Sequence, residues 1–149
     1  MRVHHRVERT WQVAGTRVAL IEATEPERGP DVHPLVHSVS GVHRRDDVDH
    51  WIIHEHLPIG PLTLPNAYRV SRKVLPDRIV LRAWSRPGIH LVHTLLINGT
   101  DGALTVRHTV DIDAPLWTMP FVRRTAAAAH DDWIAHLRDW VETHSASGT

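Results

Sequence analysis

The stretch Ile89–Ile112 reads IHLVHTLLINGTDGALTVRHTVDI, and it decides the fold. On each side of the turn cluster Asn98–Gly102, every second residue is apolar apart from one histidine, His93 or His108. Such alternation is typical of a half-buried strand, and Asn, Gly and Asp tolerate the left-handed backbone of a tight turn. The stretch therefore predicts a β-hairpin with one apolar face.

The register of this hairpin follows from matching the two apolar faces. Pairing Ile97 with Leu104 matches them at every step and places His93 opposite His108, with Cβ atoms about 5 Å apart. A buried imidazole must be hydrogen-bonded or used in chemistry. Two interpretations stay open: an acid/base pair that shares about one proton near neutral pH, or two core histidines bonded to one another.

Length and composition narrow the classes of protein. The 149 residues fit a single domain, which we place over residues 1–144 with a flexible tail over 145–149. The 17 basic and 17 acidic residues balance, which argues against nucleic acid or an anionic membrane as the main partner. The chain has no cysteine, so disulfides and thiolate chemistry are excluded. Without an apolar run of membrane-spanning length or an apolar leader, we expect a soluble cytoplasmic protein.

Apolar spacing and turn residues divide the rest of the chain into short elements. A first strand around residues 3–7 precedes a helix over 16–23 and a proline-rich segment with a second short helical turn. The strands that follow are expected over residues 38–44, 50–57, 67–74 and 78–84, with a polar turn at 45–49 and a rigid loop at 58–65.

The last element changes period. From about Thr118 to Thr143 the apolar residues fall on one helical stripe: Val122, Ala126, Ala129, Trp133, Leu137, Trp140 and Val141. A long antiparallel meander curls, and the helix can bury its stripe only against the concave face. The sequence therefore predicts an α+β helix-grip fold, with a curved antiparallel sheet of six to seven strands around a long C-terminal helix and two short helices after strand one.

This order of elements resembles the START/Bet v1-like superfamily (SRPBCC) of polyketide cyclases, dehydratases and lipid carriers. Leu104–Pro115, LTVRHTVDIDAP, is similar to the final strand and proline junction of aromatic polyketide aromatase/cyclases. His33–Val39 resembles the turn from the second short helix into the second strand. The resemblance covers nearly the whole chain and implies a cavity between sheet and long helix that holds an apolar molecule.

The middle of the long helix is the expected wall of this cavity. The small residues of Thr125–Ala129 face a curved sheet, which leaves room, and the bulky Trp133 follows. We expect Ala126 and Trp133 to contact the ligand, although alanine is also simply the best helix former. His130 either completes a histidine cluster with the hairpin or lies half in water at the boundary.

Two more candidates lie on the hairpin over residues 67–84. Pairing Val74 with Ile79 puts Arg72 and Tyr68 on the inner face. An inward arginine would bind a carbonyl, enolate or carboxylate of the substrate, with Tyr68 donating a hydrogen bond beside it. A one-residue slip would instead place Arg72 at the rim in water.

A third set of polar residues alternates along the strand over 50–57. His50, His54 and His56 share one face and Trp51 lies on the other. The more apolar face should point inward, which leaves the histidines outside, and a metal needs three or four converging ligands. By the same logic Glu55 points inward, as a substrate-contacting base or in a salt bridge.

These patterns favour a cofactor-independent enzyme without a metal. We expect a cyclase or dehydratase acting on a polyketide-like or other small apolar carbonyl compound, with His93 and His108 as the acid/base pair. The alternative is a non-catalytic carrier or sensor of a lipid-like or aromatic ligand. The expected partner is that small ligand, and the sequence leaves a homodimer open.

Overall fold

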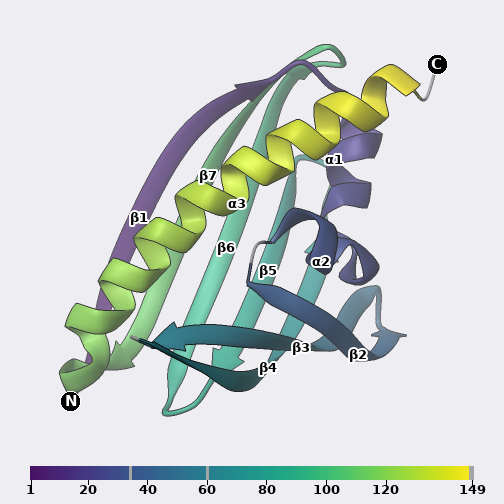
Figure 1. Cartoon of the computed structure of the whole chain (residues 1–149). Helices are drawn as coiled ribbons and strands as arrows, with labels where there is room; N and C mark the ends of the chain where they lie inside the picture. Colours follow the sequence, from purple (N-terminus) through teal and green to yellow (C-terminus); the bar gives the residue numbers. More distant parts are fainter. Residues whose placement is uncertain (34, 60, 148–149) are drawn as a thin grey trace.

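A computed structural model describes residues 1–33, 35–59 and 61–147 of the chain. The strands are β1 (Arg2–Val13), β2 (Val36–Arg45), β3 (Val48–Ile59), β4 (Leu62–Val74), β5 (Arg78–Ser85), β6 (Ile89–Thr100) and β7 (Ala103–Pro115). The helices are α1 (Arg17–Ala23), η1 (Pro26–Arg28), α2 (Gly29–Val32), η2 (Leu116–Thr118) and α3 (Met119–Ser147). The strands form one antiparallel sheet in the order β1-β7-β6-β5-β4-β3-β2 (Figure 1). The predicted helix-grip architecture is confirmed.

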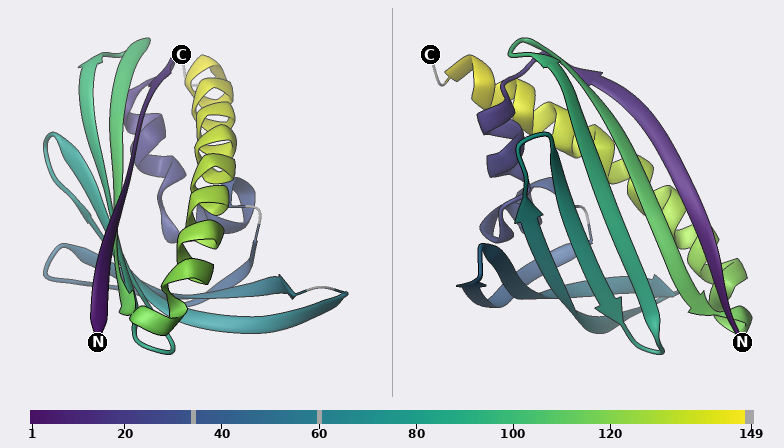
Figure 2. Two further views of the ribbon diagram at one scale, coloured as in Figure 1. Left: turned by 90° about the vertical axis from the view of Figure 1, so that its left-hand side faces the viewer. Right: turned by 180° about the vertical axis from the view of Figure 1, so that it is seen from behind.

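The curved sheet wraps around α3, which crosses its concave face diagonally (Figure 2). Two separate core clusters hold the helix. Towards its C-terminal end, Trp133, Leu137 and Val141 belong to the larger cluster. Towards its N-terminal end, Met119 and Val122 pack with residues of β7. The helix is therefore anchored on both sides of its small-residue stretch, which itself contributes little bulk.

The β6–β7 hairpin forms with a register two residues away from the expected one. A two-residue turn, Asp101–Gly102, joins the strands, and Ile97 pairs with Val106 rather than Leu104. The expected pairing is wrong because the turn cluster is shorter than assumed and Gly99 continues the strand. A shift of two preserves the face of every side chain. His93 and His108 consequently share the inner face as diagonal neighbours, opposite Val110 and Leu95.

The rigid loop expected over residues 58–65 is also wrong. β3 runs to Ile59 and β4 starts at Leu62, so both flanking prolines lie in strands. The pairing of β2 with β3 ends at Val36 and Glu55, and the pairing of β4 with β5 ends at Arg69 and Trp84. Past these residues, towards the turn that joins them, β3 and β4 pair only with each other. Proline is tolerated at such edges because no further strand needs its missing N–H. The result is a two-stranded extension that projects past the rest of the sheet (Figure 2).

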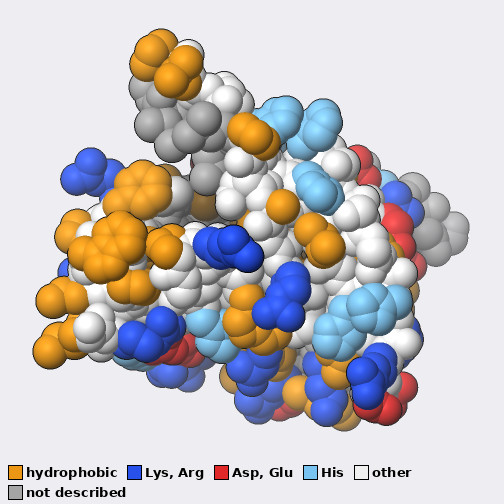
Figure 3. All heavy atoms as spheres, turned by 90° about the horizontal axis from the view of Figure 1, so that it is seen from below, with side chains coloured by type: hydrophobic (Ala, Val, Ile, Leu, Met, Phe, Trp, Pro, Cys, Tyr) orange, Lys and Arg blue, Asp and Glu red, His pale blue; other side chains and the backbone are white. Residues whose placement is uncertain are grey.

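The lower end of the molecule carries exposed hydrophobic side chains. Figure 3 shows them gathered beside a recess in the surface. Leu116, Trp117 and Phe121, at the start of the C-terminal helical segment, are exposed, and Trp117 keeps 75% of its surface. Across the described residues, no helix combines the length and apolar character that crossing a membrane requires.

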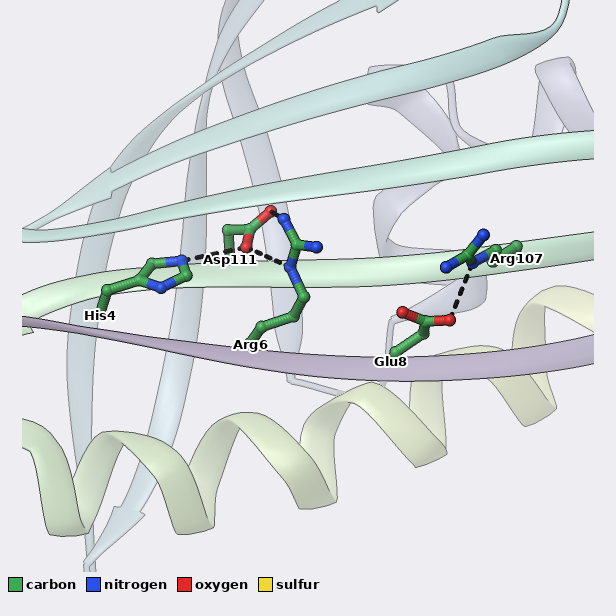
Figure 4. Close-up of polar contacts among 5 residues, drawn as sticks. All are labelled: His4, Arg6, Glu8, Arg107 and Asp111. Atoms are coloured by element: carbon green, nitrogen blue, oxygen red, sulfur yellow. Dashed lines mark hydrogen bonds and ion pairs between the residues drawn. The ribbon is translucent and has the colours of Figure 1, made fainter.

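Ion pairs join β1 to β7 on the outer side of the sheet (Figure 4). Asp111 accepts hydrogen bonds from Arg6 Nε at 2.7 Å and pairs with His4 Nε2 at 3.0 Å. Arg107 Nε donates to Glu8 at 2.8 Å. Arg6, followed by His4, lowers the pKa of Asp111. Exposed pairs of this kind contribute less than about 1 kcal/mol each, so the matched apolar faces, rather than these charges, set the register.

Two glycines of the β6–β7 hairpin test this register. Gly99 and Gly102 have φ of 93° and 92°, but only a Cβ on Gly99 would overlap the carbonyl oxygen of Ala103. Gly102→Ala should lose about 1 kcal/mol, the strain of a left-handed alanine. Gly99→Ala should lose roughly 3 kcal/mol because the clash adds to that strain. Urea denaturation measures both, and equal losses would contradict the register.

Candidate functional site

A cavity of about 490 Å³ lies between the concave face of the sheet and α3. Its volume falls in the range of small-molecule sites. The lining residues are His33, Leu35, Glu55, Asn66, Tyr68, Ala83, Ser85, Arg86, Pro87, Ile89, Leu91, His93, Val110, Trp117, Thr118, Phe121, Val122, Thr125, Ala126, Ala129, His130 and Trp133. The wall is mostly apolar, with histidines at one place and a carboxyl group at another.

Small side chains of α3 create this space. Thr125, Ala126 and Ala129 line the cavity between the two core clusters that anchor the helix. The exposed Trp117 and Phe121 line it at the start of the helical segment. The expectation that the alanines face a hollow is thus met by the geometry.

Three histidines and a tryptophan form one cluster beside the cavity. His93 Nδ1 and His108 Nε2 are 3.1 Å apart and share a hydrogen bond whose donor depends on the tautomers. The ring of His130 stands edge-on to that of His108, with centroids 4.1 Å apart. Trp133 contacts both His93 and His108 at centroid distances of 5.2 Å. His130 therefore joins the cluster. It does not lie half in water, because only 3% of its surface is accessible to solvent.

Burial keeps these imidazoles uncharged. It is the main reason that the pKa of His93 falls to about 3 and that of His130 to about 4. Burial, then the neighbouring His93 and His130, holds the pKa of His108 well below its ordinary value. Desolvation therefore favours two uncharged rings over the expected sharing of one proton near neutral pH. Both ring nitrogens of His130 are buried without a hydrogen-bond partner among the described residues.

Glu55 lies on the strand β3, away from the histidine cluster. Its side chain is 8% exposed and accepts a hydrogen bond from Asn66 Nδ2 at 3.0 Å. A second hydrogen bond joins it to the Tyr68 hydroxyl. Burial raises the pKa of Glu55 and also that of Tyr68. The expected inward direction of Glu55 is met, but no arginine pairs with it among the described residues.

Arg72 is buried on the inner face, in the pairing expected from the sequence, yet it does not line the cavity. Its guanidinium donates to Asp49 at 3.0 Å, to the carbonyl of Ile21 at 2.7 Å and to Thr24 Oγ1 at 2.9 Å. These bonds tie the end of α1 to β3 and β4. Neither the ligand contact nor the solvated rim position describes the side chain.

A smaller cavity of about 90 Å³ adjoins the first beneath the short helices. It shares His33, Tyr68, Ala83, His93 and Trp133 with the main cavity. Burial lowers the pKa of His33 to about 4, and the ring of His33 lies 6.1 Å from that of Trp133. The two spaces are thus divided by ring systems.

The histidines of β3 lie on the outer face, as the alternation predicts, with Trp51 buried inside. His54 Nε2 bonds to Ser40 Oγ at 2.8 Å, and the rings of His56 and His37 stack. Among the residues that the structure describes, no three histidine, aspartate or glutamate side chains converge as metal ligands.

The structure brings together His93, His108, His130 and Trp133, and separately Glu55 and Tyr68. Ala126 lines the space between the helix and the sheet. Asn66 was not predicted, because it lies between the loop expected over residues 58–65 and the strand expected from residue 67. The only sequence signal for the exposed Trp117 and Phe121 is their spacing of four residues, which is typical of one helix face, just before the apolar stripe that begins at Val122.

Comparisons with known proteins concern the fold. No protein-family model matches the chain, and no curated protein matches it. The solved di-domain ARO/CYC StfQ from the steffimycin biosynthetic pathway is similar, with a TM-score of 0.76 at 16% identity over 98% of this chain. This chain spans about half of StfQ, 52% of its length.

Two shorter proteins are similar over most of both chains. Zhui aromatase/cyclase from Streptomyces sp. R1128 gives a TM-score of 0.64 at 14% identity, covering 96% of this chain and 94% of its own. Norcoclaurine synthase from Thalictrum flavum gives 0.65 at 13% identity, covering 95% and 86%. At such identities these likenesses establish the arrangement of strands and helices.

Replacing Arg72 should reveal its bracing role. Arg72→Met leaves Asp49 without its partner and frees the end of α1, so unfolding free energy should fall by about 3 kcal/mol. Arg82→Met, at an exposed position on β5, is the control and should change it by less than about 0.5 kcal/mol. Urea titration followed by circular dichroism measures the difference. An Arg72 variant as stable as wild type would contradict this role.

The depressed histidine pKa values predict acid sensitivity. Below pH 6.5 the unfolded chain protonates His93, whereas the folded chain does so only near pH 3. The free energy of unfolding should therefore decrease as the pH is lowered through this window, by about 1.4 kcal/mol per pH unit for this one residue. Folded His93→Gln should show a shallower decline. Denaturant titrations from neutral to acidic pH provide the test, and parallel declines in both proteins would count against a buried uncharged His93.

Proposed function

We propose that this chain, which has the Bet v1-like helix-grip fold, is a cyclase or dehydratase. Its substrate would be a polyketide-like or other small apolar carbonyl compound held in the main cavity. The observation that carries the proposal is His93 on the wall of an apolar cavity of about 490 Å³, hydrogen-bonded to His108, which is fully buried and is not among the residues that line the cavity. The similar aromatase/cyclases StfQ and Zhui favour this reaction class over others.

The cavity would contribute mainly by confinement. A flexible chain held between Trp133 and the alanines of α3 would have its reactive carbons near one another, and such positioning removes much of the entropic barrier of ring closure. Water excluded by the apolar wall could not compete for the carbonyl groups. No resident metal or cofactor enters this proposal.

The histidine pair would act in its uncharged form. With Nδ1 of His93 bonded to His108, Nε2 is the nitrogen left for the cavity. It presents a lone pair in one tautomer and an N–H in the other. The pair could accept a proton from a carbon beside a carbonyl, or donate a hydrogen bond to the resulting enolate oxygen. The low pKa of His93 favours the second role, because a neutral imidazole with that pKa is a weak base.

The second candidate is a carrier or sensor that binds an aromatic or lipid-like ligand unchanged. The lowered pKa values of His93 and His130 favour this second candidate, because uncharged imidazoles can hydrogen-bond to a ligand without transferring a proton. Catalysis of proton exchange separates the two candidates, because a carrier binds its ligand without accelerating any chemical step.

Benzoylacetone, an aromatic β-diketone, is a suitable probe. An enzyme should bind it, seen as tryptophan quenching, and speed exchange of its central C–H protons with D₂O in proton NMR. In His93→Gln this exchange should fall on the order of 10²-fold, with binding retained. His50→Gln, on the outer face, is the matched control.

Binding without acceleration would establish the carrier and refute the enzyme. Absence of binding would contradict both candidates. If folded His93→Gln exchanged the C–H protons of benzoylacetone as fast as wild type, His93 would have no part in the catalysis.

A further inference from the structure

Glu55 is the one carboxyl group among the described residues that line the main cavity. It also lines a separate groove on the outer side of the sheet, as does Asn66. This groove, of about 410 Å³, is bordered by His37, His54 and His56. Glu55 is therefore a residue that the apolar interior and the outer groove share.

The local backbone explains this position. A bulge in β2 between Val36 and Ser38 falls where that strand meets Glu55. Bulges interrupt the ladder and redirect side chains. On the other side, β4 contributes Asn66 and Tyr68, which hold the carboxyl group by hydrogen bonds. Glu55 is thus fixed in orientation without a cation to neutralise it.

Glu55 and the histidine cluster occupy different walls. β3 and β6 are separated in the sheet by β4 and β5, which is roughly 14 Å across the strands, and strand pairing puts His93 level with Asp49 rather than with Glu55. Both line the same cavity because the sheet curves. A substrate between them would meet an imidazole on one side and a carboxyl group on the other.

We propose that Glu55 is a catalytic acid/base of this cavity, which works opposite the histidine pair and exchanges its proton with solvent through the outer groove. This inference rests on the proposed enzymatic function and names a residue that performs it. The substrate class that such a pair would take is a β-hydroxy carbonyl compound or its β-dicarbonyl precursor.

The step balances without a further reactant. The Glu55 carboxylate removes a proton from the carbon beside the carbonyl group, and the electron pair moves into an enolate held within the cavity. The enolate then expels the β-hydroxyl group, which takes the proton from the Glu55 carboxylic acid and leaves as water. A carbon–carbon double bond forms, and Glu55 returns to its starting state.

The surroundings of Glu55 suit both halves of this step. Desolvation raises its pKa, which makes the carboxylate a stronger base for the first half of the step, and the acid that forms is the donor for the second half. The titratable groups around it are Tyr68 on β4, His54 and His56 on β3, and His37 on β2; His33 faces the same cavity. The groove that Glu55 borders is open to water, and it is the route by which solvent protons would reach this residue.

The test uses the full chain with benzoylacetone and three variants. Glu55→Gln should keep fluorescence-detected binding and lose exchange of the probe's C–H protons on the order of 10²-fold or more. Glu55→Asp should recover part of that loss, and Glu22→Gln, at an exposed position of α1, should match wild type. Infrared difference spectra should show a protonated carboxyl band in wild type at mildly acidic pH that is missing from Glu55→Gln.

The outcomes separate this inference from the proposed function. Wild-type acceleration with an equally fast Glu55→Gln would overturn the role of Glu55 and leave the histidine proposal standing. Probe binding without acceleration in wild type would overturn the enzymatic function and this inference with it.

A separate experiment tests whether Glu55 exchanges its proton with solvent through the outer groove. The double variant His37→Gln/His56→Gln should exchange slowly in dilute buffer and recover on addition of imidazole. Wild-type exchange of this variant in dilute buffer would overturn the route.

Discussion

The separation between α3 and the middle of the sheet is the constraint on which the rest of the structure depends. Trp133 and Leu137 pack one end of the helix, and Met119 and Val122 pack the other. The helix is held at the distance that those large side chains set, and Ala126 and Ala129 cannot fill the gap. Protein interiors are normally packed without such voids, so a sequence that places small residues here maintains a hollow at some expense of stability.

An apolar hollow determines the chemistry of any polar group on its wall. The dominant influence on His93, His108 and His130 is desolvation, which removes their charge, whereas the same influence favours a proton on Glu55. The interior thus brings an uncharged imidazole and a carboxyl group of raised pKa to different walls of one space. Opposed groups of this kind are suited to proton transfer between carbon and oxygen.

Sequence periodicity predicted the architecture well because alternation and helical stripes depend on burial, which the fold then imposes. It placed His93 and His108 on one face correctly, although the register was wrong: the choice depends on whether Gly99 belongs to the turn or the strand, which is decided by backbone packing. The role of Arg72 could not be predicted, because its partners Ile21 and Thr24 come from a distant helix end. The site residue Asn66 was not predicted, because the prolines nearby indicated a loop. The sequence does not reveal that β3 and β4 pair only with each other here, which is what allows prolines within these strands.

The protonation of the buried rings tests the account most directly, through long-range nitrogen–proton NMR of the imidazole side chains at neutral pH. The account predicts that His93 and His108 each show one protonated and one unprotonated ring nitrogen, unchanged down to about pH 5, and that an aromatic diketone shifts the His93 signals and leaves those of His50 in place. Imidazolium signals from either inner ring at neutral pH, or ligand shifts confined to the outer face, would contradict it.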